Sequence, residues 1–121
     1  MVVIHSTGGP TCDEATGKAI WVKAGALDDN LRHIEAHPVL GIHYMIDRDG
    51  TLRASVPEGQ LAHHVYRFSE RSIAIELIND GDGIDPFPDA QLTALVTLLR
   101  DIQQRRGIRR DGIQRHSDLD H

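Results

Sequence analysis

The chain has 121 residues, a length that suits one domain with a single hydrophobic core. Thirteen Lys and Arg against eighteen Asp and Glu give a formal charge of −5, which argues against nucleic acid as the main partner. No apolar run approaches the ~18 residues of a membrane span, and a single cysteine excludes an internal disulfide. Residues 1–4 lead directly into an apolar segment, so no signal peptide is expected there.

The first predicted element is a short buried strand over residues 2–4, which ends at His5. Open α/β sheets bind ligands beyond the carboxyl ends of their strands, which makes His5 a candidate ligand. A histidine at this position equally suits a strand cap that hydrogen-bonds to the following loop. The sequence contains eight histidines, and only their placement separates metal ligands from structural histidines.

Residues 11–38 are predicted to be mainly helical, in two segments. Asp13 is a candidate cap for a first helix that ends at Gly25, and apolar residues recur at helical spacing in the second. His33 and His37 lie four residues apart on the second helix, a spacing that can bind a metal. No carboxylate motif accompanies them, so they are interpreted as surface histidines.

Residues 41–57 are predicted to form a β-hairpin. Apolar and polar residues alternate on both sides of an Asp49-Gly50 turn, which is a strong local hairpin signal. His43 lies within the first strand of this hairpin. It is interpreted as a packed, hydrogen-bonded core histidine rather than a ligand.

Residues 71–80 are predicted to be the central strand of the sheet. Period-two alternation with β-branched residues indicates a strand, and two largely apolar faces indicate cover on both sides. Glu76 is the exception, a lone carboxylate between Ala74 and Ile78 on one face. An unpaired buried carboxylate needs a partner, a metal-bound water or a raised pKa, so Glu76 is a candidate functional residue. The alternatives are an exposed edge position and a structural ion pair.

Residues 88–106 are predicted to be a core helix that Gly107 terminates, followed by a short strand at Ile113 that leads to His116. The helix is expected to bury one stripe, formed by Leu92, Leu95, Val96, Leu99 and Ile102. The mixture of strands and helices predicts one α/β domain over residues 1–121. Histidines after the first and last strands, with a carboxylate on the central one, would suit a catalytic zinc site.

Six segments in this order resemble the zinc-dependent N-acetylmuramoyl-L-alanine amidases: VVIHST, GIHYMIDRDGTL, LAHHV, RSIAIELINDGDG, FPDAQLTALVTLL and RHSD. This family includes phage lysozyme-type amidases, peptidoglycan-recycling amidases and animal peptidoglycan recognition proteins. The likeness extends from Val2 to about Asp118 and is faint over residues 11–38. It implies an α/β fold with a central mixed β-sheet flanked by helices, and a monomer that acts on peptidoglycan or muropeptide fragments.

The resemblance also implies roles for individual residues. His5 and His116 match zinc (Zn2+) ligands, and Glu76 matches the acidic residue that activates water in the recycling-type enzymes. His64 matches a histidine that lines the site, with His63 in the place of a tryptophan of the relatives. The implied reaction is hydrolysis of the amide between N-acetylmuramic acid and the L-alanine of the stem peptide.

Two departures from the family pattern bear on these expectations. The family's third zinc ligand, an Asp or Cys, lies about ten residues beyond the second histidine, so the carboxyl-terminal part of the family domain is expected to be missing here. Ile42 occupies the place of a site tyrosine in phage and animal members, which favours the branch that relies on the strand carboxylate. The alternative is a module of the same fold that binds muropeptide without hydrolysing it. The substrate favours the cell envelope, but a cytoplasmic protein remains open.

Overall fold

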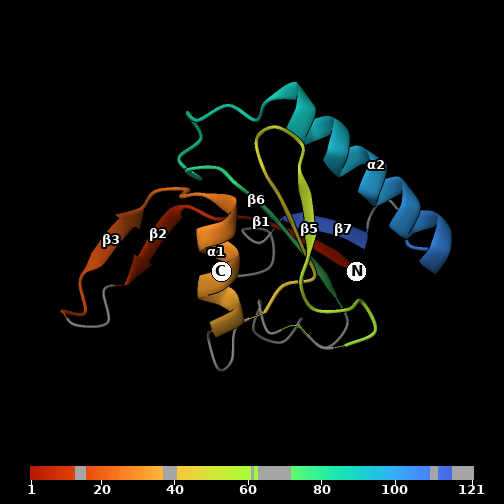
Figure 1. Ribbon diagram of the computed structural model, residues 1–121, viewed down its shortest axis with the longest axis horizontal. Coiled ribbons are helices and arrows are strands. Elements are labelled where there is room, and N and C mark those ends of the chain that lie inside the picture. The colour runs from red at the N-terminus through yellow and green to blue at the C-terminus, as the bar shows by residue number, and fades with distance from the viewer. Residues whose placement is uncertain (13–15, 37–40, 61, 63–71, 110–111, 116–121) are drawn as a thin grey trace.

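The computed structural model describes residues 1–12, 16–36, 41–60, 62, 72–109 and 112–115 (Figure 1). Its elements in chain order are β1 (Val2–Ser6), β2 (Gly9–Cys12), β3 (Ala19–Val22), α1 (Leu27–Ala36), β4 (Tyr44–Ile46), β5 (Leu52–Ala54), β6 (Ile73–Leu77), α2 (Asp89–Arg106) and β7 (Ile113–Arg115). Within these residues, neither helix is both long enough and apolar enough to cross a bilayer.

Five strands form one mixed sheet in the order β5-β4-β6-β1-β7. β4 and β5 are antiparallel, whereas β4–β6, β6–β1 and β1–β7 are parallel pairs. β6 therefore lies at the centre of the sheet, as its two apolar faces predict. The mixed sheet, with a helix against each face, confirms the expected fold class.

The two faces of the sheet bury separate clusters of side chains. The first cluster joins the sheet to α2 and consists of Val2, Ile46, Ile73, Ile75, Leu77, Leu95, Leu98 and Ile102. The second joins the sheet to α1 and the residues before it, and consists of Ala24, Leu27, Ile42, Met45, Ala74 and Ile78. Successive residues of a strand project to opposite faces, so the alternation along β6 divides its side chains between these clusters.

Helix α2 begins and ends as predicted, but it buries a different stripe. Gly107 adopts a left-handed conformation, with φ 65°, and its N–H donates to the carbonyl of Gln103. The buried residues are Gln91, Leu95, Leu98 and Ile102, whereas Leu92 and Val96 are exposed. The buried face of α2 is therefore rotated from the expected stripe, because it includes the polar residue Gln91, which an apolar pattern does not mark.

Gln91 fastens the first turn of α2 to the sheet. Its Nε2 donates to the carbonyl oxygens of Ile46 and Ile78, each at 3.1 Å, so it bridges the ends of β4 and β6. The carbonyl of Ile46 also accepts from the N–H of Ile78 at 3.0 Å. A leucine at this position would therefore remove one of the two hydrogen bonds of Ile46 O and the bond from Gln91 to Ile78 O.

Residues 9–22 contradict the helix expected to begin near Asp13. β2 and β3 instead form a separate two-stranded antiparallel sheet, which projects from the main sheet in Figure 1. The run Ile20-Trp21-Val22 has the β-branched and aromatic character of a strand, which explains the result. The expected second helix is confirmed as α1, and the expected hairpin as β4–β5.

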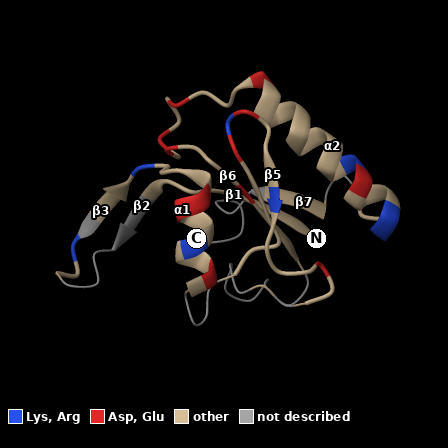
Figure 2. Ribbon diagram, viewed as in Figure 1, with Lys and Arg blue, Asp and Glu red and all other residues tan. Residues whose placement is uncertain are grey.

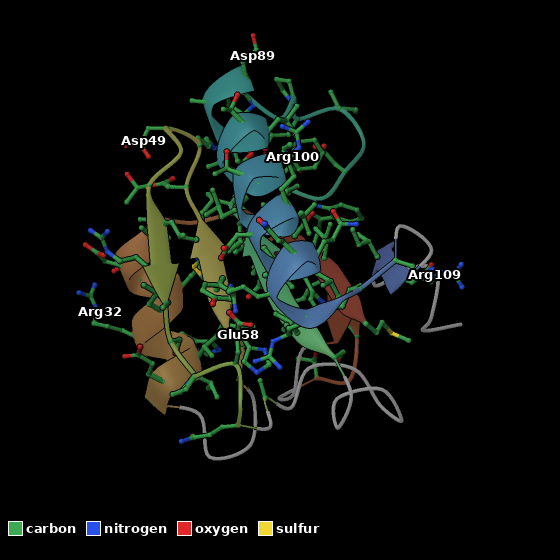
Figure 3. The ribbon with its side chains drawn as sticks, turned by 90° about the vertical axis from the view of Figure 1, so that its right-hand side faces the viewer. Arg32, Asp49, Glu58, Asp89, Arg100 and Arg109 are labelled. Carbon is green, nitrogen blue, oxygen red and sulfur yellow. The ribbon has the colours of Figure 1, made fainter. Side chains whose placement is uncertain are left out.

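Charged residues occupy the carboxyl end of α2 and the loop that follows β5 (Figure 2), and their side chains connect the two (Figure 3). Glu58 lies beside the carboxyl-terminal turn of α2, where Arg105 Nη2 donates to it at 2.8 Å and Arg106 Nε at 2.7 Å. Tyr44 Oη also donates to this carboxylate. The hydrogen bonds of Arg105, ahead of those of Tyr44 and Arg106, lower the pKa of Glu58 to about 2. This network is structural and lies on the α2 side of the sheet.

Candidate functional site

His5 and Glu76 are direct neighbours across the β1–β6 pair. The two strands are parallel, and the register places His5 opposite Glu76. Residues opposite each other in a ladder project to the same face of the sheet. Both side chains therefore lie on the face that α1 covers, near the carboxyl ends of their strands.

Away from His5, apolar side chains lie beside Glu76 on that face. Ala74 and Ile78 flank it along β6, and Met45 is its register partner on β4. All three belong to the buried cluster beneath α1. Glu76 thus places a carboxyl group at the rim of a hydrophobic cluster, as its sequence context predicts.

One oxygen of this carboxyl group is buried without a hydrogen-bond partner. Glu76 Oε2 has none among the residues that the structure describes. Burial removes the group from water and raises the pKa of Glu76 to about 7. A carboxyl group with this pKa can accept a proton near neutral pH and then release it, which a general base must do.

The backbone at the carboxyl ends of β1 and β6 is tightly packed. The N–H of Thr7 donates to Leu77 O at 3.0 Å, and that of Gly8 donates to Asn79 O at 2.9 Å. A Cβ on Gly8 would lie 2.8 Å from Asp80 Cα, closer than real Cβ contacts allow. Glycine at this position therefore lets the chain after His5 run directly against the loop after Glu76.

The remaining predicted site residues lie outside the described part of the chain. These are His116, His64 and its neighbour His63. The described part of β7 ends at Arg115, which pairs with Ile4, one residue before the level of His5. Among the described residues, no three His, Cys, Asp or Glu side chains come close enough together to hold a metal. The structure thus brings together His5 and Glu76 of the predicted set.

His43 has the structural role expected from its position in the hairpin. It is almost fully buried, with Nε2 at 2.8 Å from Gln60 O and Nδ1 accepting from the N–H of Ala74 at 2.9 Å. Since Nδ1 accepts, Nε2 carries the proton and donates to Gln60. Both ring nitrogens are occupied by backbone partners, so His43 is not a ligand.

An exposed tryptophan near this edge was not among the predicted site residues. Trp21 on β3 is 53% exposed, and its Nε1 donates to Asp80 O at 3.2 Å. The signal available in the sequence was an aromatic residue between two β-branched ones, in a chain with five aromatics. The helix predicted for this segment conceals that signal, and the observed strand reveals it.

Comparison with known proteins places the chain among amidase-like domains. The model of the family described as N-acetylmuramoyl-L-alanine amidase matches residues 1–121. The amidase LysC from Clostridium intestinale URNW is 22% identical with a TM-score of 0.69, over 98% of this chain and 70% of that chain. The search of curated proteins finds no match.

Two insect proteins have a similar structure. Drosophila peptidoglycan recognition protein SA is 20% identical with a TM-score of 0.69, over 96% of this chain and 66% of that chain. Apis mellifera PGRP-SA is 18% identical with a TM-score of 0.70, over 98% of this chain and 70% of that chain. At these identities, the likeness shows a shared fold.

Proposed function

Because the chain belongs to the N-acetylmuramoyl-L-alanine amidase family, we propose that it hydrolyses the amide bond between N-acetylmuramic acid and L-alanine with the help of zinc. The observation that carries the proposal is the alignment of His5 with Glu76 on adjacent strands. An imidazole and a carboxylate with a raised pKa then face the same side of the sheet.

Two of the described residues supply groups that a metal centre at this place would use. His5 offers an imidazole, a preferred zinc ligand, and Glu76 Oε2 is a buried oxygen without a partner in the described part of the chain. In the proposal His5 and His116 hold the ion, and His64 lines the site. When bound, zinc supplies a Lewis acid that polarises the amide carbonyl and makes water easier to deprotonate.

Glu76 moves the proton in the proposed reaction. Its carboxylate accepts a proton from the water whose oxygen forms a bond to the carbonyl carbon. The same carboxyl group then delivers that proton to the amine nitrogen of L-alanine as the carbon–nitrogen bond breaks. Ala74, Ile78 and Met45 keep the carboxyl group in apolar surroundings, which holds its pKa near the working range.

Metal content, measured on purified protein, tests the first half of the proposal. Wild-type protein is expected to contain about one zinc per chain, with loss of the metal in His5→Ala. His33→Ala is the matched control, because His33 is exposed on α1 and its removal should leave the zinc in place. Equal zinc in wild type and His5→Ala would remove His5 from the site.

Hydrolysis of a defined muropeptide tests the second half. The expected products are a free sugar carboxylate and a peptide with a new amino terminus at L-alanine, both measurable by mass spectrometry. The alternative function is binding without hydrolysis, which the fold likeness to two recognition proteins favours. Saturable muropeptide binding by zinc-loaded protein without these products would establish that alternative.

A further inference from the structure

Trp21 is held in place although more than half of it is exposed. It is the only tryptophan in the sequence, and it lies on β3 of the projecting hairpin. Its indole nitrogen donates to Asp80 O, so the side chain faces the loop after β6. Ile20 and Val22 alternate with it and face the opposite side of the hairpin.

Side-chain hydrogen bonds fix this loop to the segment that follows the hairpin and to Arg48. Asp80 Oδ1 accepts from the N–H of Ala24 at 2.8 Å, and the N–H of Asp80 donates to Asp85 Oδ2 at 2.8 Å. Arg48 in turn donates to both oxygens of Asp85, at 2.8 and 2.6 Å. The carbonyl that accepts from Trp21 is therefore part of a connected set of hydrogen bonds.

An aromatic side chain that is held before its ligand arrives loses little conformational freedom on binding. Tryptophan also has more apolar surface to gain by being covered than any other side chain. An exposed indole with a fixed orientation therefore has the properties of a binding surface rather than of a solvated loop residue.

Trp21 borders the face that carries Glu76. Asp80 follows Glu76 by four residues, so their Cα atoms lie at most ~14 Å apart. Ala24, three residues after Trp21, packs in the same buried cluster as Ala74 and Ile78, which flank Glu76. If a substrate bound at His5 and Glu76 extends toward the β2–β3 hairpin, it therefore passes the indole of Trp21.

We propose that Trp21 is a platform on which a sugar ring of the substrate stacks. The inference rests on the proposed function, which places an amino sugar on one side of the cleaved amide. A pyranose ring has an apolar C–H face and polar edges, which matches the exposed face of an indole. Trp21 then sets a preference for substrates that carry the sugar, and it does not touch the cleaved bond.

The fluorescence of the single tryptophan tests the contact directly. Zinc-loaded Glu76→Gln protein, which should bind without turnover, is titrated with a disaccharide muropeptide and with the same stem peptide lacking sugar. A saturable change in emission intensity or wavelength is expected with the muropeptide alone. The same change in emission with both ligands would overturn the proposal. So would unchanged emission at a muropeptide concentration that calorimetry shows to saturate the protein.

Kinetics give a second test that a purely structural role would not reproduce. Trp21→Ala is expected to raise KM for the muropeptide about tenfold with little change in kcat, since stacking adds binding energy away from the cleaved bond. The same variant should hydrolyse a D-lactoyl-peptide, which lacks the sugar ring, as wild type does. Trp21→Phe should recover most of the loss, and Ile20→Ala, on the other side of β3, should behave as wild type.

The failures of the two proposals are distinguishable. If wild type hydrolyses the muropeptide and Trp21→Ala does so with the same KM, the sugar platform is overturned and the proposed amidase activity stands. Sugar-dependent fluorescence without any hydrolysis by wild type would overturn the amidase and leave the platform. An equal loss on both substrates would also overturn the platform, because it would show that Trp21 only supports the fold.

Discussion

Two glutamates of this chain occupy opposite environments on opposite sides of the sheet. Glu58, with a side chain 10% exposed, accepts hydrogen bonds from Arg105, Arg106 and Tyr44, and its pKa falls to about 2. Glu76 has an oxygen without a partner in the described structure, and burial raises its pKa to about 7.

The comparison shows how one residue type serves two purposes in a single domain. Positive partners keep Glu58 ionised at every ordinary pH, so it joins elements and exchanges no proton. Apolar neighbours leave Glu76 balanced between its two protonation states, which suits proton transfer and weakens the fold. We therefore expect mutations of Glu58 to change stability, and mutations of Glu76 to change chemistry.

The largest expected effect is on turnover. Glu76→Gln should lower kcat by about 10²–10⁴-fold while zinc content stays unchanged, because the variant keeps the shape of the side chain and loses the base. Glu58→Gln should keep kcat within about twofold of wild type, because Glu58 lies on the other side of the sheet. Only the loss of a general base should lower kcat by the larger amount expected for Glu76→Gln. Steady-state assays on one muropeptide compare the two. Activity retained by Glu76→Gln would remove Glu76 from the mechanism.

The second expected effect is on the pH dependence of stability in chelator-treated protein. The pKa of Glu76 is about 7 in the folded state against an ordinary value of 4.5, so the folded state holds a proton that the unfolded state has released between these pH values. Stability therefore falls as pH rises through this window, by about 2–3 kcal/mol from pH 5 to pH 8.

Urea unfolding at pH 5 and pH 8 measures this change. Glu76→Gln should lack it, so the variant should gain stability relative to wild type at pH 8 and not at pH 5. A parallel pH dependence in both proteins would show that the carboxyl group finds a partner outside the described residues.

The third expected effect has the opposite sign of pH dependence. Glu58→Gln should cost about 1–2 kcal/mol at pH 7, because charge-assisted hydrogen bonds to two half-exposed arginines are partly screened by solvent. The pKa of Glu58 is lowered in the folded state, so this stabilisation is present above pH 4.5 and is lost as pH falls toward 2. Acid titration of the unfolding midpoint checks it, with Glu35→Gln on the exposed side of α1 as a control.

The smallest expected effect concerns the hydroxyl group of Tyr44. Tyr44→Phe removes one donor to Glu58 and leaves both arginines, so a loss of about 0.5–1 kcal/mol is expected. The acid-induced loss of stability should begin at a slightly higher pH, because one of the groups that lower the pKa of Glu58 is gone. Chemical unfolding of the two proteins across pH 3–7 measures both changes.

Two local patterns in the sequence predicted their elements correctly. The alternation along residues 73–77 predicted a central strand with Glu76 on an apolar face, and Gly107 predicted the end of α2. The family resemblance and the α/β fold are likewise confirmed. The alternation and the glycine are local signals, because they depend on spacing within a few residues, whereas the resemblance depends on segments spread over the whole chain.

Contacts between distant segments leave no pattern within either segment, so their details could not be predicted. Glu58 is separated in sequence from Arg105 by 47 positions and from Arg106 by 48, and no local pattern predicts these hydrogen bonds. The register that aligns His5 with Glu76 depends on how two strands pair, which neither strand specifies alone. The β2–β3 hairpin was misread because Asp13 and Gly25 resemble helix-boundary residues, and β2 has no apolar alternation.

The pairing of β1 has a consequence for how the chain acquires its fold during synthesis. β1 hydrogen-bonds to β6 and β7, which begin at Ile73 and Ile113, and both are made long after β1 leaves the ribosome. Strands that pair across such separations close late, because a long loop must be ordered first. The apolar residues Val2 and Val3 therefore lack their partners in the sheet until β6 and β7 have been synthesised, and chaperone binding at β1 should aid folding in cells.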